Sequence, residues 1–132
     1  MPLSTPPLLL RLTATILGTI PLLFGINALL RPAHALSFFT PLYPSYPPDV
    51  SSPERRLIDA LLVVYGARDV FMGLAVLVPL WAGSRKVAGV MMVAGAGVAG
   101  VDGGVCRAAG GGEWDHWGYA PVLAGVGVAL MV

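Results

Sequence analysis

Residues 57–80 read LIDALLVVYGARDVFMGLAVLVPL, and this stretch decides the fold. It is mostly apolar and long enough to cross a bilayer, which takes about 20 residues at a rise of about 1.5 Å each. Its start is marked by Ser51 and Glu54, which have the spacing of a helix capping box, and by Pro53 in the first turn. The stretch therefore predicts a transmembrane helix.

The rest of the chain repeats this pattern. The 132 residues are 56% hydrophobic and 11% charged, whereas a soluble domain carries roughly 25% charged residues. Further apolar runs cover residues 8–30, 87–106 and 117–132. We expect an all-α protein, namely a single domain over residues 1–132 that forms an integral membrane bundle of four transmembrane helices.

The N-terminal run also resembles a signal peptide. Ala33-His34-Ala35 has the form of a cleavage site. However, the apolar run 8–30 is longer than the usual apolar region of about 7–15 residues, and Arg11 is the first basic residue. We therefore expect the first span to be retained.

Residues 31–50 are rich in proline and aromatic residues. Aromatic side chains with a polar edge favour the membrane interface. This segment is either a lid that lies on the bilayer surface or a plain connector. Its marker residues are Phe38, Phe39, Tyr43, Pro44, Tyr46, Pro47 and Pro48.

Several function classes lack their sequence signals. The net charge is +1 and there is no long charge run, so we expect no nucleic acid partner. The single cysteine, Cys106, cannot form an internal disulfide and reads as a small apolar filler. Neither a nucleophile elbow nor a P-loop is present, and no G-x-G-x-x-G motif follows a strand. We expect no cofactor, and no metal site, because the spacing of His34, Glu113, Asp115 and His116 matches no metal motif.

Charged residues inside the spans are the best functional candidates, because an ionisable group near the bilayer centre costs about 2.5–3.5 kcal/mol on insertion scales. Arg68 and Asp69 lie roughly 17 Å into the second span. The side chain of Arg68 leans back toward its helix N-terminus, on the same side as Asp59 and Asp102. We predict an acid–base site with four catalytic candidates: Asp59, Arg68, Asp69 and Asp102. The residues expected to line the substrate site are Asn27, Tyr65, Met72, Trp114 and His116.

Two carboxylates that share one arginine can protonate one atom and deprotonate another in the same step. In chemistry alone, the Asp–Arg–Asp set looks like that of limonene-type epoxide hydrolases, which have a different, soluble fold. The leading hypothesis is epoxide opening on a lipophilic small molecule, by hydrolysis or by cyclic ether formation. Cyclisation or isomerisation of a terpenoid or polyketide is an alternative, because it needs the same acid, base and arginine. In a structural alternative, Arg68 only pairs with Asp69 or Asp102, and the protein is a membrane scaffold or a small transport subunit.

Small residues recur at four-residue spacing in the third span and are frequent in the fourth, which allows close helix approach in lipid. The pattern indicates packing inside one bundle or, alternatively, a homodimer interface. The residues are Gly89, Val93, Ala96, Gly97, Gly100, Gly104, Gly118, Gly125 and Gly127.

Two motifs resemble a known family. Residues 61–73 read LLVVYGARDVFMG and residues 99–103 read AGVDG. With the four-span layout, they resemble domain of unknown function 4267, a family of small membrane proteins found in fungi and bacteria. The shared positions are Gly66, Arg68, Asp69, Gly73, Asp102 and Gly103. The resemblance implies a compact helical membrane protein. Some fungal members are linked to polyketide or terpenoid pathways, which implies a tailoring enzyme of secondary metabolism in the endoplasmic reticulum or another endomembrane.

Overall fold

The computed structural model describes residues 8–39 and 49–132, and these residues form helices and no strand. Three helices are long, two are short, one is of intermediate length, and η1 is a single 3-10 turn. Their bounds are α1 Leu8–Leu30, α2 Pro32–Leu36, η1 Ser37–Phe39, α3 Pro53–Trp81, α4 Arg85–Ala108, α5 Trp114–Trp117 and α6 Ala120–Met131.

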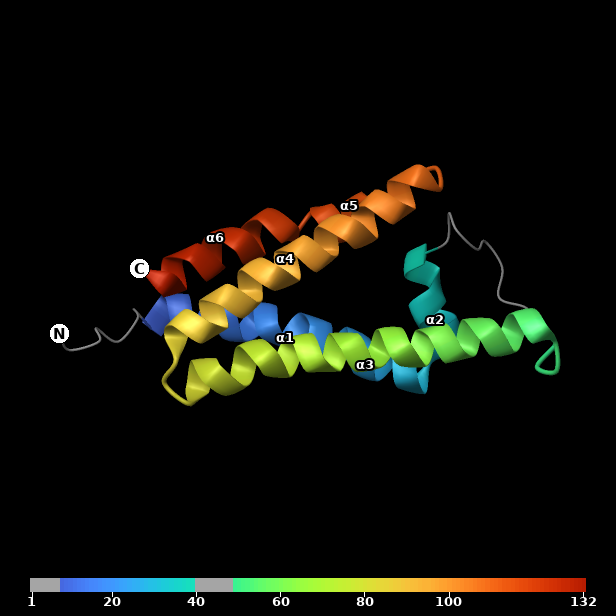
Figure 1. Cartoon of the computed structure of the whole chain (residues 1–132), viewed down its shortest axis with the longest axis horizontal. Helices are drawn as coiled ribbons and strands as arrows, with labels where there is room; N and C mark the ends of the chain where they lie inside the picture. The colour runs from blue at the N-terminus through green and yellow to red at the C-terminus, as the bar shows by residue number, and fades with distance from the viewer. Residues whose placement is uncertain (1–7, 40–48) are drawn as a thin grey trace.

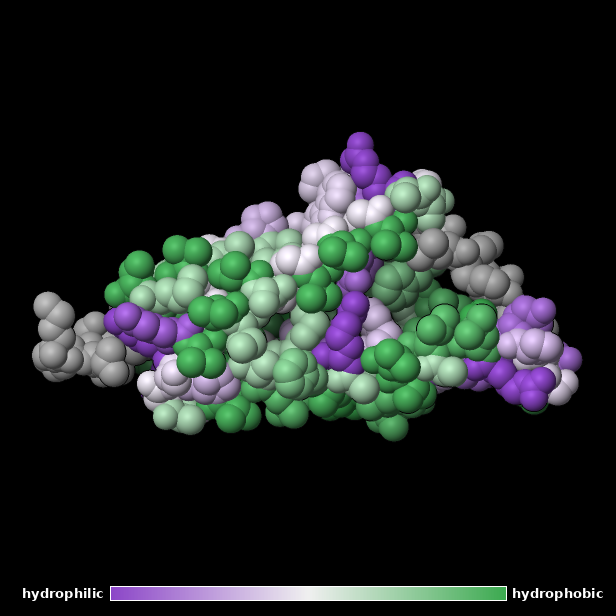
Figure 2. All heavy atoms as spheres, viewed as in Figure 1, coloured by the Kyte–Doolittle hydropathy of each residue, from purple (hydrophilic) through white to green (hydrophobic). Residues whose placement is uncertain are grey.

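Within the described ranges, three helices are long and apolar enough to cross a membrane, namely α1, α3 and α4. On the face shown in Figure 2, hydrophobic residues cover most of the surface, and hydrophilic ones gather at its edges and in one streak near the middle. The expectation of an all-helical membrane protein is therefore confirmed. The expected count of four spans is not, because residues 117–132 do not form one helix. The chain turns between Trp117 and Ala120, and α6 has only 12 residues.

Close backbone contact joins the helices into two pairs, α1 with α3 and α4 with α6 (Figure 1). Gly25 of α1 faces Gly66 of α3 so closely that a Cβ atom on Gly25 would lie 2.5 Å from the Gly66 carbonyl oxygen. Gly89 of α4 and Gly127 of α6 meet in the same way. These glycines serve packing inside the bundle. Among the other small residues, Cβ atoms at Gly97, Gly100, Gly104 and Gly125 would meet nothing within 4 Å.

The two helix pairs diverge toward one end of the molecule, and α2 stands in the opening between α3 and α4 (Figure 1). Buried Ala35 of α2 packs with Ala28 of α1 and Leu62 of α3. The expected loop 31–50 is thus helical over part of its length, because α2 has an apolar face to bury. Five of its marker residues lie outside the described residues: Tyr43, Pro44, Tyr46, Pro47 and Pro48.

Helix α3 starts at Pro53, earlier than the predicted span. Its N-cap is Ser52, whose Oγ accepts a hydrogen bond from the backbone N–H of Arg55 at 3.1 Å. The predicted cap at Ser51 is wrong by one residue. Ser51 instead donates from its N–H and its hydroxyl to Oδ1 of Asp49, so its side chain is engaged in the preceding turn.

Candidate functional site

An ion triad joins the two helix pairs near the middle of α3. Arg68 donates from Nη1 and Nη2 to the two carboxylate oxygens of Asp102 on α4, at 3.1 and 2.8 Å. Its Nε donates to Oδ1 of Asp69 at 3.1 Å, and its Nη2 lies 3.0 Å from the same oxygen. Asp69 is only 4% exposed, while Arg68 is partly open. Of the four predicted catalytic residues, Arg68, Asp69 and Asp102 therefore lie together.

The local geometry of α3 explains how Arg68 reaches both partners. Helical side chains lean toward the N-terminus, so that of Arg68 lies over the preceding turn. There its guanidinium carbon lies 4.4 Å from the centre of the Tyr65 ring, a cation–π contact. The stacked ring keeps the planar guanidinium in place, with its donors directed at the two carboxylates.

A narrow cleft adjoins this triad. Its volume is about 30 Å³, enough for a water molecule. Arg68, Asp69 and Asp102 line it, together with the predicted residues Tyr65 and Met72. Met72 lies across from Gly95 of α4, whose Cβ would be 3.5 Å from the methionine Cε. The cleft thus places a water-sized space directly beside both carboxylates.

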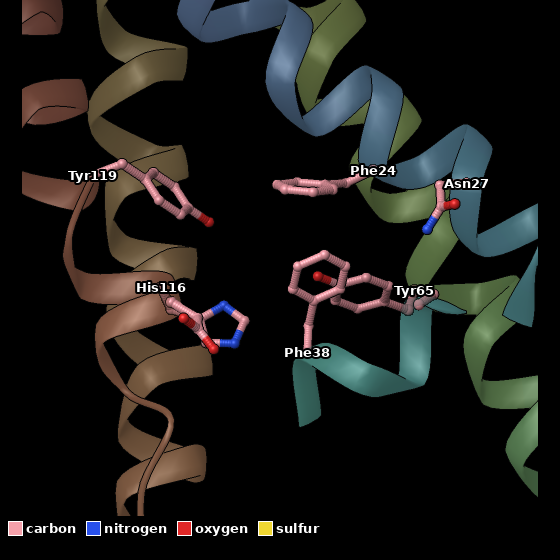
Figure 3. A pocket seen from close by; sticks show the side chains of 8 residues that line it. Phe24, Asn27, Phe38, Tyr65, His116 and Tyr119 are labelled. Carbon is pink, nitrogen blue, oxygen red and sulfur yellow. The ribbon is translucent and has the colours of Figure 1, made fainter. Parts of the chain in front are cut away.

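A larger pocket opens between the diverging pairs, with a volume of about 110 Å³. In Figure 3, His116 and Tyr119 come from the α5–α6 side and point toward aromatic side chains from α1, α3 and η1. Asn27 lies at its edge and contacts His34 Nδ1 at 3.0 Å. The lining residues are Phe24, Asn27, Ala35, Phe38, Tyr65, Asp115, His116 and Tyr119.

The cleft and the pocket are neighbours. Phe24, Tyr65 and Tyr119 line both of them, so the cleft beside the ion triad adjoins the pocket at these three rings. The sequence predicted Tyr65, Asn27 and His116 for the substrate site, and all three line the pocket. It did not select Phe24, which lies one turn before Asn27 on the same face of α1.

Two predicted site residues lie elsewhere. Asp59 is near the start of α3, roughly 14 Å along the helix from Arg68, and forms an ion pair with Arg55 at 3.2 Å. Helix spacing alone explains its distance from the triad. Trp114 is 71% exposed and packs edge-to-face on Trp117, which points inward and donates from Nε1 to the Gly100 carbonyl oxygen at 3.0 Å.

In the described ranges, no group of three or more histidine, cysteine or acidic residues lies close enough to hold a metal ion. Cys106 is fully buried in α4. The polar chemistry of the site therefore lies in the triad, the two phenols Tyr65 and Tyr119, the imidazole of His116, the carboxylate of Asp115 and the amide of Asn27.

The fold and the site define a helical membrane protein with a buried arginine–carboxylate triad beside a pocket. The chain belongs to the family described as Domain of unknown function (DUF4267), whose sequence model matches residues 18–130. The expected family is thus confirmed. No protein with a curated description and no solved structure matches the chain.

Proposed function

We propose that this protein is a membrane-embedded enzyme that opens an epoxide on a lipophilic substrate by acid–base chemistry. One observation carries the proposal. The Arg68 triad lines a water-sized cleft, and that cleft shares three aromatic walls with a larger pocket. A substrate in the pocket would face a water molecule and two carboxylates, which is the arrangement that hydrolysis needs.

The two aspartates take different roles in the proposed reaction. Arg68 holds both oxygens of Asp102 but contacts only Oδ1 of Asp69. A protonated Asp69 beside an ionised Asp102 makes the triad neutral overall, which lowers the cost of placing it in the membrane interior. Asp69 then acts as the acid and Asp102 as the base, with Arg68 as the bridge.

The steps balance without any redox change. Asp69 gives its proton to the epoxide oxygen as one ring C–O bond breaks. Asp102 takes a proton from water as the water oxygen bonds to the carbon, and a diol forms. A proton returns from Asp102 to Asp69 to reset the site. An internal hydroxyl in place of water gives a cyclic ether, and the same acid can start a terpenoid or polyketide cyclisation or an isomerisation.

The test uses purified protein in lipid nanodiscs and a panel of lipophilic epoxides in ¹⁸O-labelled water. Mass spectrometry should detect a diol that carries one ¹⁸O atom. Asp102→Asn and Asp69→Asn should each lower the rate about 100-fold or more, the usual range for a lost acid or base. Asp59→Asn is the matched control on α3 and should keep the wild-type rate. Equal rates in all four proteins would refute the roles given to Asp69 and Asp102.

The scaffold or transport alternative rests on the same triad, which also clamps α3 to α4. In the native host, a gene deletion and the Asp102→Asn variant can be compared by profiling lipid-soluble metabolites. An enzyme predicts that both strains accumulate the same compound. A profile that changes in the deletion strain alone would favour the scaffold or transport subunit. A fluorescent fusion in that host tests the proposed place in the endoplasmic reticulum or another endomembrane.

We also propose that α6, with α5, makes a fourth membrane crossing. The support is its course along α4, where Gly127 meets Gly89, and the position of its end beside the start of α1 (Figure 1). Four crossings put both ends of the bundle on one side of the membrane. Single cysteines introduced at Leu8 and Val132, in a Cys106→Ala background, should then react with an impermeant thiol reagent from the same side. If the two cysteines are labelled from opposite sides of the membrane, only α1, α3 and α4 cross it.

A homodimer through α4 is the remaining part of the proposal. Gly97, Gly100 and Gly104 have room for another helix, since a Cβ atom at each would meet nothing within 4 Å. Gly100→Leu should then abolish dimers detected by cross-linking in nanodiscs, whereas Val90→Leu on the exposed surface of α4 should not.

A further inference from the structure

We propose that the pocket at His116 and an adjoining groove on α3 form one binding site for an amphipathic molecule: a single ring that bears a hydroxyl group, with a long apolar tail. This inference names a substrate class for the proposed function and rests on it for the reaction. The binding itself is argued from three features that lie outside the ion triad: the imidazole of His116, the size of the pocket, and the groove.

His116 is the first feature. It is 4% exposed, and its Nε2 atom is shielded from solvent with no hydrogen-bond partner among the described residues. An unpaired buried polar atom costs about 1–3 kcal/mol, so a native protein seldom keeps one without a use. The imidazole lines the pocket and points toward the aromatic wall opposite (Figure 3). A ligand hydroxyl can either donate to or accept from this nitrogen, so it suits both imidazole tautomers.

The size and walls of the pocket are the second feature. Its volume is about 110 Å³, while a cavity of about 150 Å³ in another protein holds benzene. Phe24, Phe38 and Tyr65 supply flat aromatic faces, and Asn27, Asp115 and Tyr119 supply polar groups beside His116. The pocket is therefore of the order of size that takes a single ring, and it has no room for a whole lipid-sized molecule.

The groove is the third feature. It has a volume of about 310 Å³ and runs between α3 and the α2–η1 segment. Its walls are aliphatic or aromatic: Leu36, Phe39, Ile58, Leu61, Leu62 and Tyr65. Leu61 is 58% exposed on a helix that is long and apolar enough to cross a membrane, so we expect the groove to open toward lipid tails. An alkyl or isoprenoid tail fits such walls, whereas a polar chain would lose its hydration there.

Two side chains connect the groove to the pocket. Tyr65 lines both, and the centre of its ring lies 5.3 Å from that of Phe39. Phe39 also lies against His116, again with 5.3 Å between ring centres. Phe39 thus stands between the tail groove and the imidazole, on the single 3-10 turn of η1. A molecule that enters from lipid along the groove would bring its ring past Phe39 to His116.

The test uses 4-octylphenol as the probe, because it has one ring, one hydroxyl and an apolar tail. A version with a diazirine at the end of the tail is photolysed with the wild-type protein in phosphatidylcholine nanodiscs. Labels should map to the α3 peptide around Leu61. The octylbenzene analogue, which lacks the hydroxyl, should label about tenfold less, the upper range for one buried hydrogen bond. Equal labelling by the two probes would overturn the role of His116.

Two variants separate the head site from the tail site. His116→Phe keeps an aromatic ring against Phe39 but removes Nε2, so the preference for the hydroxyl should disappear. A preference that survives in this variant would contradict the proposal. Leu61→Trp should block the groove and lower labelling by octylphenol several-fold, while binding of 4-methylphenol stays unchanged. Leu74→Trp, on the exposed surface of α3 outside the groove, is the matched control.

Alkylphenols contain no epoxide, so this test does not depend on turnover. Selective binding of octylphenol without any diol formation from epoxides would uphold the site and refute the proposed reaction. If the protein forms diols, but octylphenol labels the His116→Phe and Leu61→Trp variants as strongly as the wild type, the reaction is upheld and this binding site is refuted.

Discussion

Arg68 donates to both carboxylate oxygens of Asp102, at 3.1 and 2.8 Å, and this bidentate pair joins the α1–α3 half of the molecule to the α4–α6 half. The halves diverge toward one end of the molecule (Figure 1), and residues of α1, α2, η1, α3 and α5 line the pocket. A charge pair thus connects α3 with α4. The same two residues also line the narrow cleft beside them.

Loss of this arginine should damage folding. Arg68→Ala leaves Asp69 and Asp102 facing each other in a region of low dielectric, which costs about 3–5 kcal/mol for a broken buried pair. Arg55→Ala removes an i,i+4 pair with Asp59 near the start of α3 and should cost only about 0.3–0.5 kcal/mol. Thermal unfolding in detergent, followed by circular dichroism, measures both. Similar unfolding temperatures for the two variants would show that the triad contributes little to stability.

The contact between Gly25 and α3 should tolerate no side chain. A Cβ atom there would lie 2.6 Å from the backbone nitrogen of Val70 as well as 2.5 Å from the Gly66 oxygen. Gly25→Ala should therefore push α1 from α3 and cost about 1–3 kcal/mol or more. Gly97→Ala, where the added atom meets nothing, is the control and should keep or slightly raise the unfolding temperature. If the two substitutions change the unfolding temperature equally, Gly25 does not pack against α3 without space for a side chain.

Trp117 should tie α5 to α4. Its indole N–H donates to the Gly100 carbonyl oxygen, and its ring lies directly over Gly103. Trp117→Phe removes the donor and should lower stability by about 0.5–1.5 kcal/mol. Trp114→Phe, at an exposed position, should change little. Chemical unfolding of the two variants in detergent compares them, and a larger loss in Trp114→Phe would contradict this assignment.

The start of α3 should depend on Ser52. Ser52→Ala removes the side-chain acceptor for the Arg55 N–H and should cost about 1 kcal/mol. Ser51→Ala leaves that cap intact and should cost less. Amide hydrogen exchange in the first turn of α3 reports the difference directly. If amide hydrogens exchange faster in Ser51→Ala than in Ser52→Ala, the N-cap residue is Ser51 and not Ser52.

The carboxyl group of Asp49 should have a lower pKa than an ordinary aspartate. The hydroxyl and the N–H of Ser51 both donate to its carboxylate, and these bonds lower the pKa of Asp49 from the usual 3.8. Because the folded-state pKa is lowered, the turn gains stability at neutral pH and loses it as pH falls through the carboxyl range. Carbon NMR of the Asp49 carboxylate measures this midpoint. Ser51→Ala should raise it toward 3.8, and an unchanged midpoint would remove Ser51 as the cause.

Much of the site could be predicted from the sequence because charge inside an apolar run needs a partner. Arg68 and Asp69 lie in mid-helix, and Asp102 lies inside the only other long apolar run that carries an acidic residue. The lean of helical side chains then placed Arg68 toward Asp102. Asp59 was included wrongly with this cluster. The sequence shows an acidic residue between apolar neighbours, but it does not show that Arg55 forms the ion pair with Asp59.

By itself, the sequence determined that this is a helical membrane protein, since apolar runs of such length can satisfy their backbone in lipid only as helices. It also predicted that Arg68 needs an acidic partner inside the bundle, without deciding which of Asp59, Asp69 and Asp102 that is. Only the tertiary structure decided how the helices divide into pairs. Many glycines could have allowed two helices to approach closely, and only the packed structure shows that Gly25 and Gly89 do so. It alone placed His116 inward and Trp114 outward, since the turn after α4 sets which side of a four-residue helix is buried.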